Sequence, residues 1–186
     1  MAIAVDHDRY FVVTGGPGSG KTALIDALAA RGRARTVEAG RAIIRDQVAI
    51  GGPALPWSDP RAFAELMLCW EMRSWHMAAG AEGPVIFDRG IGDVVGYLRL
   101  TGLAVPAHVE QAARHFRYNR RIFVAPPWAD IFRQDEERKQ SFVEAEATFR
   151  AMVEVYSSLG YDLLFLPLAP VSRRVAFVEE HIAEIR

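Results

Sequence analysis

One short stretch, TGGPGSGKT at residues 14–22, constrains the fold of this chain more than any other feature of its sequence. The apolar run YFVVT leads into it, with the β-branched and aromatic residues of a strand buried on both faces. The segment ALIDALAARG follows, with apolar residues at helical spacing. Glycine loses more conformational freedom on folding than any other residue, so a glycine-rich turn between a strand and a helix requires a physical reason.

The stretch matches the pattern G-x-x-x-x-G-K-[ST], which suits a backbone that binds a chain of phosphates. Backbone N–H groups wrap phosphates only through close approach and unusual φ values, and glycine permits both. The pattern predicts that Lys21 reaches the β- and γ-phosphates of ATP and that the Thr22 hydroxyl binds Mg²⁺. The alternative is a glycine turn with a structural role alone. The predicted nucleotide-binding residues are Gly15, Gly16, Gly18, Ser19, Gly20, Lys21 and Thr22.

The rest of the chain alternates short apolar runs with helical patterns, which predicts an α/β fold with a parallel sheet covered on both faces. We expect one domain over residues 1–186. Ligands bind such sheets at the carboxyl ends of the strands, so residues that follow the strands should converge on one cleft. The predicted strands are residues 10–14, 35–40, 85–88, 120–125 and 161–168, and the predicted helices are residues 21–31, 41–50, 60–81, 91–101, 106–117, 141–158 and 173–185.

Asp88 ends the apolar run VIFD, where a second metal-binding side chain is needed because Thr22 alone does not fix Mg²⁺ at the phosphates. Alternatively, Asp88 caps the next helix. Nucleotide-driven motors commonly carry a glutamate directly after this aspartate to polarise water, whereas here the next residue is Arg89. A guanidinium is no base at neutral pH, but it can bind an anionic acceptor or the transferred phosphoryl group. This favours phosphoryl transfer over steady hydrolysis.

Glu38 ends the second predicted strand and should face the glycine-rich turn. A carboxylate there can accept a proton from a hydroxyl that attacks the γ-phosphorus. The alternative is that Glu38 caps the helix that begins near Arg41 and pairs with that arginine. We expect Glu38, Arg41 and Arg89 to bind the acceptor.

The charged run DIFRQDEERKQ follows the fourth predicted strand. It predicts a lid-like segment at about 128–141, whose arginines close over the phosphates and exclude water. Arg133 and Arg138 are the candidates for stabilising charge on the transferred group. The alternative is an ordinary solvated helix face.

Composition narrows the classes of partner. Twenty-two Lys and Arg against 23 Asp and Glu leave a net charge of −1, without the positive excess of a nucleic-acid-binding protein. No uncharged stretch approaches 18 residues and the N-terminus is not a secretory signal, so we expect a cytoplasmic protein without a membrane partner. The single cysteine, Cys69, fits a reducing compartment and should be buried.

An apolar stripe runs along the helix predicted over residues 60–81. At helical spacing such a stripe indicates the face that packs on the core. It comprises Phe63, Leu66, Met67, Trp70, Ser74 and Met77.

The chain resembles bacterial P-loop ATPases of the kind named AAA-domain proteins, which are similar to nicotinamide riboside, deoxynucleoside and thymidylate kinases. The resemblance spans nearly the whole chain and rests on TGGPGSGKT, VEAGR, VIFDRGIGD, RIFVAPPW and DEER. It implies a three-layer P-loop NTPase fold with a five-stranded parallel sheet in the order 2-3-1-4-5. It also implies that Glu38 and Arg89 hold the acceptor. With 186 residues, the chain leaves no room for the extra helical domain of AAA+ ring motors.

Together these features favour an ATP- and Mg²⁺-dependent phosphotransferase that acts on a small acceptor, such as a nucleoside, a nucleotide or another hydroxyl metabolite. A nucleotide-dependent regulatory ATPase or switch with a protein partner is the alternative, and a binding module without turnover is a third reading. The chain contains no N-K-x-D signature for guanine, which disfavours a GTPase switch.

Overall fold

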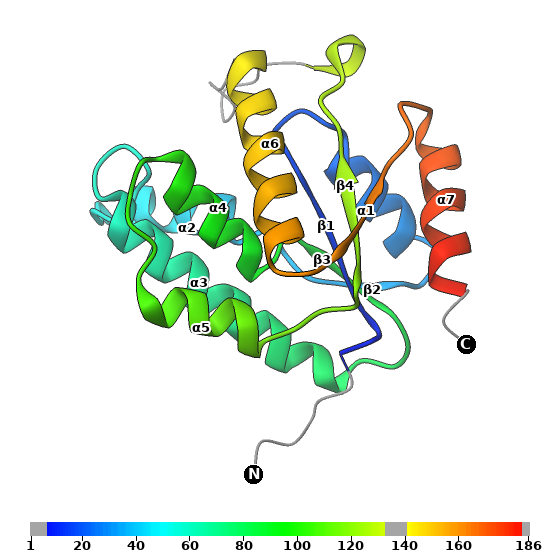
Figure 1. Ribbon diagram of the computed structural model, residues 1–186, viewed down its shortest axis with the longest axis horizontal. Helices are drawn as coiled ribbons and strands as arrows, with labels where there is room; N and C mark the ends of the chain where they lie inside the picture. Colours follow the sequence, from blue (N-terminus) through cyan, green and yellow to red (C-terminus); the bar gives the residue numbers. More distant parts are fainter. Residues whose placement is uncertain (1–6, 133–140, 184–186) are drawn as a thin grey trace.

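The computed structural model describes residues 7–132 and 141–183, which form helices around a five-stranded sheet (Figure 1). The strands pair in the order β2-β3-β1-β4-β5, and every pairing is parallel. This order confirms the one predicted. The strands are β1 (Tyr10–Gly15), β2 (Ala34–Arg35), β3 (Val85–Asp88), β4 (Arg121–Ala125) and β5 (Asp162–Phe165).

The central strand β1 is buried along its whole length, as its uninterrupted apolar sequence predicts. It pairs with β3 on one side and with β4 on the other. In this register Val13 lies opposite both Asp88 and Phe123. The carboxyl ends of β1 and β3 therefore lie side by side, and the turn after β1 emerges next to Asp88.

Helices cover both faces of the sheet (Figure 1). On one face, α1 and α7 pack through Leu24, Ile25 and Val178 in a single cluster with the sheet. On the other face, α3 and α6 contribute side chains such as Trp75 and Tyr156. The helices are α1 (Lys21–Ala29), α2 (Ala39–Ile50), α3 (Pro60–Met77), α4 (Ile91–Leu100), α5 (Ala107–His115), α6 (Phe142–Ser158) and α7 (Val171–Ala183), with short 3₁₀ turns η1 (Ala78–Gly80) and η2 (Ala129–Ile131).

The second strand is shorter than the sequence predicts, because regular pairing stops at Arg35. The Thr36 backbone N–H still donates to the Ile86 carbonyl at 2.9 Å, after which the chain turns into α2. That helix begins at Ala39 and not at Arg41. Glu38 therefore precedes the first helical residue and does not end a strand.

The buried face of α3 is rotated from the predicted stripe. Leu66 is 36% exposed and Met77 is 67% exposed, and the thiol of Cys69 is exposed and not buried. The reason is that α3 packs against α4 as well as the sheet, so a second row of residues turns inward. The buried residues of α3 are Phe63, Ala64, Leu68, Glu71 and Trp75.

Within residues 7–132 and 141–183, no helix has both the length and the apolar character needed to cross a membrane.

The packing of α4 on α6 can be tested at Gly92. An added Cβ there would lie 2.7 Å from the ring of Tyr156, whose hydroxyl is held by a hydrogen bond to Asp93. Gly92→Ala should lower the free energy of unfolding by about 1–3 kcal/mol, because the ring cannot move away without losing that bond. Gly80→Ala is the control, since a Cβ there meets nothing within 4 Å. Equal urea midpoints for the two variants would contradict this packing.

Candidate functional site

The turn between β1 and α1 is held in a shape that side chains would prevent. Gly18 and Gly20 have φ values of 70° and 77°, in the left-handed region. A Cβ at Gly15 would collide with the carbonyl oxygen of Ala125 at the end of β4. The turn therefore lies tight against the sheet and delivers the chain into α1, whose first residue is Lys21. Such a turn at a helix N-terminus fits an anion of phosphate type.

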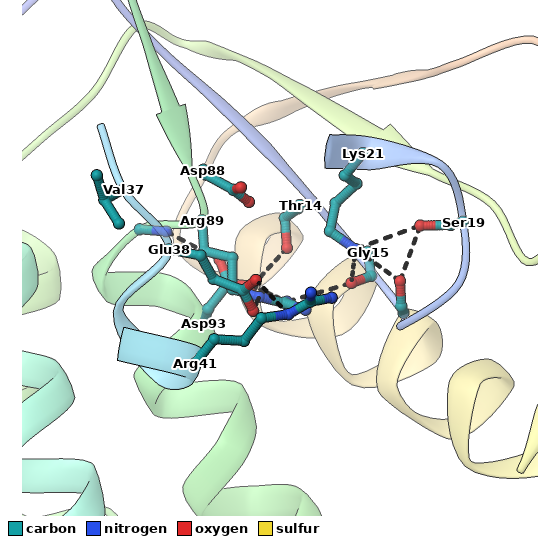
Figure 2. A network of polar contacts seen from close by, with 12 residues as sticks. Thr14, Gly15, Ser19, Lys21, Val37, Glu38, Arg41, Asp88, Arg89 and Asp93 are labelled. Carbon is teal, nitrogen blue, oxygen red and sulfur yellow. Dashed lines mark hydrogen bonds and ion pairs between the residues drawn. The ribbon is translucent and has the colours of Figure 1, made fainter. Parts of the chain in front are cut away.

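The Lys21 side chain folds back over this turn (Figure 2). Its Nζ donates to the carbonyl oxygens of Gly16 and Gly15 at 2.6 and 3.1 Å, and to Ser19 Oγ at 3.3 Å. Burial, with a smaller effect from the nearby Arg89 cation, lowers the pKa of Lys21 to about 7. Phosphate oxygens in place of some of these protein contacts would therefore stabilise the charged form of Lys21.

Asp88 has the character expected of a metal ligand. It is 8% exposed, and its Oδ1 is buried without a hydrogen-bond partner in the part of the chain that the structure describes. Burial and the neighbouring Glu38 carboxylate raise the pKa of Asp88, which marks a site short of positive charge. A hard cation that takes oxygen ligands, such as Mg²⁺, fits this carboxylate.

The helix-capping alternative for Asp88 is wrong. The N-cap of α4 is Gly90, and the carboxylate that accepts from the Gly90 N–H is that of Asp93, at 3.1 Å. The backbone N–H of Asp88 is itself bound to Thr36 Oγ1 at 3.1 Å, so β3 and the segment after β2 are tied together at this point.

Arg89 links Glu38, which precedes α2, to the glycine-rich turn after β1. Its Nε donates to Glu38 Oε1 at 3.2 Å, and its Nη1 donates to the Gly15 carbonyl oxygen at 3.2 Å and to Asp93 Oδ1 at 2.9 Å. Its φ of 72° is the only positive value among the non-glycine residues that the structure describes. A left-handed conformation is costly for such a side chain, and strain of this kind is common at functional sites. Figure 2 shows Arg89 between Glu38 and Gly15.

Glu38 is held by two arginines. Its Oε2 pairs with Arg41 Nε at 3.1 Å, while its Oε1 accepts from Arg89. Burial alone would raise the pKa of Glu38, but the Arg89, Lys21 and Arg41 cations outweigh it and lower that pKa. The side chain makes no capping hydrogen bond to α2. The predicted pairing with Arg41 is therefore present, and the predicted capping role is not.

Asp93, which the sequence analysis did not single out, is the centre of the network. Its Oδ1 accepts from Thr14 Oγ1 at 2.6 Å as well as from Arg89, and its Oδ2 accepts from Tyr156 Oη at 2.7 Å as well as from Gly90. Its position in the first turn of α4, where acidic residues are favoured, is a signal that could have identified it.

Glu71 on α3 is a second acidic residue that the sequence analysis missed. It is 3% exposed. Burial, together with the Asp93 and Asp88 carboxylates, raises its pKa well above the ordinary value. The Tyr97 hydroxyl on α4 is also buried, and it has no hydrogen-bond partner among the residues that the structure describes. Glu71 thus adds a buried carboxyl group to the charged residues Glu38, Asp88, Arg89 and Asp93.

The structure brings together Gly15, Lys21, Glu38, Asp88 and Arg89, from three separate segments of the chain (Figure 2). Thr22 is exposed in the first turn of α1. Arg133 and Arg138, with most of the segment predicted as a lid, lie outside the described residues.

This fold and this turn define a P-loop nucleotide-binding protein. The family model described as "AAA domain" matches residues 10–174, so the chain belongs to that family. A comparison with curated proteins gives no match.

Two solved structures of deoxyadenosine kinase from M. mycoides are similar in fold. The one with bound dATP has a TM-score of 0.65 and 10% identity, and the one with dCMP and dCDP has a TM-score of 0.68 and 12% identity. In both comparisons the alignment covers 94% of this chain and 99% of the kinase. NadR in complex with NR has a TM-score of 0.66 and 18% identity over 96% of this chain and 50% of NadR. These structures share the P-loop kinase-like fold.

The role of Asp93 can be tested by unfolding. Asp93→Ala should lower the free energy of unfolding by about 3–5 kcal/mol, because it leaves the buried Thr14 and Tyr156 hydroxyls without this acceptor and removes one of the two carboxylates that pair with Arg89. Tyr156→Phe removes one donor and no charge, so it should cost about 1 kcal/mol. Urea unfolding of both variants measures the difference. A loss in Asp93→Ala no larger than that in Tyr156→Phe would show that the network adds little stability.

Proposed function

We propose that this protein is a P-loop kinase that transfers the γ-phosphoryl group of ATP to a hydroxyl of a small acceptor. The observation that carries the proposal is the pairing of Arg89 with Glu38 directly beside the phosphate-binding turn. In this pair, the Arg89 cation can bind the acceptor and the Glu38 carboxylate can take its proton, and Arg89 itself contacts the Gly15 carbonyl.

Each residue near the turn has a proposed role. Lys21 and the backbone N–H groups of residues 15–22 bind the phosphates, and Thr22 and Asp88 hold Mg²⁺. The metal ion neutralises charge on the phosphates when it is bound. Arg89 stabilises charge on the transferred group and orients the acceptor. Arg133 and Arg138 are proposed to add charge from the lid-like segment.

Glu38 is the proposed proton acceptor. Each of its oxygens pairs with one arginine and keeps lone pairs for further hydrogen bonds, so an acceptor hydroxyl can approach on the side of Arg41, the more exposed partner. The lowered pKa keeps Glu38 ionised at neutral pH. It is then ready to receive the proton as the oxygen–phosphorus bond forms.

The acceptor is proposed to be nucleoside-like. The fold neighbours include a deoxyadenosine kinase and a NadR structure with bound NR. The Glu71 carboxyl and the Tyr97 hydroxyl are further buried polar groups on α3 and α4. A sugar or base with hydrogen-bond donors would satisfy them.

A screen of acceptors with ATP and Mg²⁺, read by the mass of the product, tests the proposal. Nucleosides, nucleotides and other hydroxyl metabolites should be supplied singly, with ADP formation followed in parallel. ATP consumption should be slow without an acceptor and should rise sharply with the correct one. Steady hydrolysis that no acceptor changes would instead support a regulatory ATPase. Bound ATP with no turnover under any condition would indicate a binding module.

Replacing Glu38 should separate transfer from nucleotide binding. Glu38→Gln keeps the shape but cannot take a proton, so transfer should fall by about 10²- to 10⁴-fold. The affinity for ATP, measured by calorimetry, should change little because Glu38 does not belong to the phosphate turn. Glu65→Gln is a matched control on the exposed side of α3, where Glu65 pairs with His108. Full activity in Glu38→Gln would reject the proposed proton acceptor.

The pKa of Lys21 predicts a pH dependence of ATP binding. In the free protein this pKa is about 7, and phosphate oxygens raise it because they favour the charged form. Binding above pH 7 should therefore take up a proton, and affinity should fall by up to about tenfold per pH unit. Calorimetry in buffers of different ionisation enthalpy measures the uptake. Lys21→Arg stays charged and should lose this dependence, and an unchanged profile would assign it to another group.

A further inference from the structure

Arg174, on the second turn of α7, is a buried cation that the proposed reaction does not use. It is 2% exposed and is one of the largest fully buried side chains. Its neighbours along α7, Val175 and Val178, belong to the apolar cluster between α1, α7 and the sheet. No carboxylate pairs with it in residues 7–132 and 141–183, and its Nε is buried without a hydrogen-bond partner.

The guanidinium contacts the phosphate-binding turn from the side of α7. Its Nη1 donates to the Ser19 carbonyl oxygen at 2.9 Å. A Cβ at Gly20 would lie 2.6 Å from the same nitrogen, so the turn closes directly onto it. Ser19 in turn donates through Oγ to the Gly16 carbonyl at 2.8 Å, and that carbonyl also accepts from Lys21. Arg174 is thus linked through Ser19 to the lysine of the turn.

The energetics of this arrangement are unfavourable for a residue with only a packing role. A buried cation without a counter-ion costs free energy, and an apolar side chain of similar length would usually be as stable or more stable. Burial lowers the pKa of Arg174, in keeping with that cost. A charge in such a place is useful when an anion binds nearby, because the surrounding low dielectric strengthens the attraction.

We propose that Arg174 is a positioning residue for the triphosphate: it holds the Ser19–Gly20 segment in its phosphate-binding shape and adds an uncompensated positive charge next to it. The inference rests on the nucleotide site of the proposed function, but not on the acceptor or on transfer. It assigns α7, through its buried arginine, a part in binding the phosphates.

The test compares three variants for binding and stability. Arg174→Met removes the charge and the hydrogen bond but keeps an unbranched apolar side chain. Arg174→Lys keeps the charge and loses the planar fork. Arg173→Met is the matched control, because it removes the same charge from the adjacent, exposed position of α7. For each protein, calorimetry gives the affinities for ATP with Mg²⁺ and for inorganic tripolyphosphate, and thermal unfolding gives stability.

Arg174→Met should bind ATP and tripolyphosphate about tenfold to a hundredfold more weakly than the unmodified protein. Its unfolding temperature should stay the same or rise, because a desolvated charge has been removed. Arg174→Lys should bind more tightly than Arg174→Met, and Arg173→Met should bind like the unmodified protein. A purely structural role predicts a different combination, in which stability falls together with binding.

Three results would overturn the inference. The first is equal ATP affinity in Arg174→Met and the unmodified protein. The second is a loss of affinity for ATP without a loss of affinity for tripolyphosphate, which would place the effect at the nucleoside part of ATP. The third is a parallel fall of stability and affinity that Arg174→Lys does not relieve. Failure of the unmodified protein to bind ATP would instead reject the proposed function. If Arg174→Met does not fold, the comparison of Arg174→Lys with Arg173→Met decides.

Discussion

The site depends on one charged contact, the guanidinium of Arg89 between Glu38, Asp93 and the Gly15 carbonyl. Parallel pairing of β1 with β3 forces the ends of these strands together, so the groups after them share one desolvated space. Burial alone would lower the pKa of Arg89, but the carboxylates of Glu38, Asp93 and Asp88 raise it above its ordinary value. Opposite charges 4 Å apart attract by about 4 kcal/mol at an effective dielectric constant of 20. That attraction offsets the strain of a left-handed arginine.

Charge balance explains why this cluster suits a metal nucleotide. Burial is the main cause of the raised pKa values of Asp88 and Glu71, and nearby carboxylates add to it. Burial is likewise the main cause of the lowered pKa of Lys21. In the proposed function, a divalent cation bound with a phosphate chain would bring opposite charges to both kinds of buried group. The charged groups concerned are Glu38, Glu71, Asp88, Asp93, Lys21, Arg41 and Arg89.

The resemblance to P-loop ATPases and kinases implied the strand order, which the structure confirms. The convergence of the residues after the strands followed from the short apolar runs, which predict a parallel sheet. The sequence did not reveal Asp93 or Glu71, since their roles depend on which helix face turns inward. The predicted stripe on α3 was right for Phe63 and wrong for Leu66 and Met77, because helix–helix packing with α4 adds an inner row, which includes Glu71 and leaves Cys69 exposed. Arg174 was missed for a similar reason: its contact with Ser19 joins segments 155 residues apart.

The same contacts affect whether the site favours phosphoryl transfer to an acceptor or hydrolysis by water. A water molecule needs a carboxylate that can order it and take its proton. Glu38 has both oxygens paired with arginines, and Asp93 accepts hydrogen bonds from Thr14, Arg89, Gly90 and Tyr156. The two arginines hold Glu38 in one orientation and keep it ionised, while its remaining lone pairs can still accept a hydrogen bond. Under the proposed function, a single water would be held at this carboxylate by one contact, whereas a larger acceptor would be held by several. The charge pairing at Arg89 thus supports the proposal that turnover depends on the acceptor.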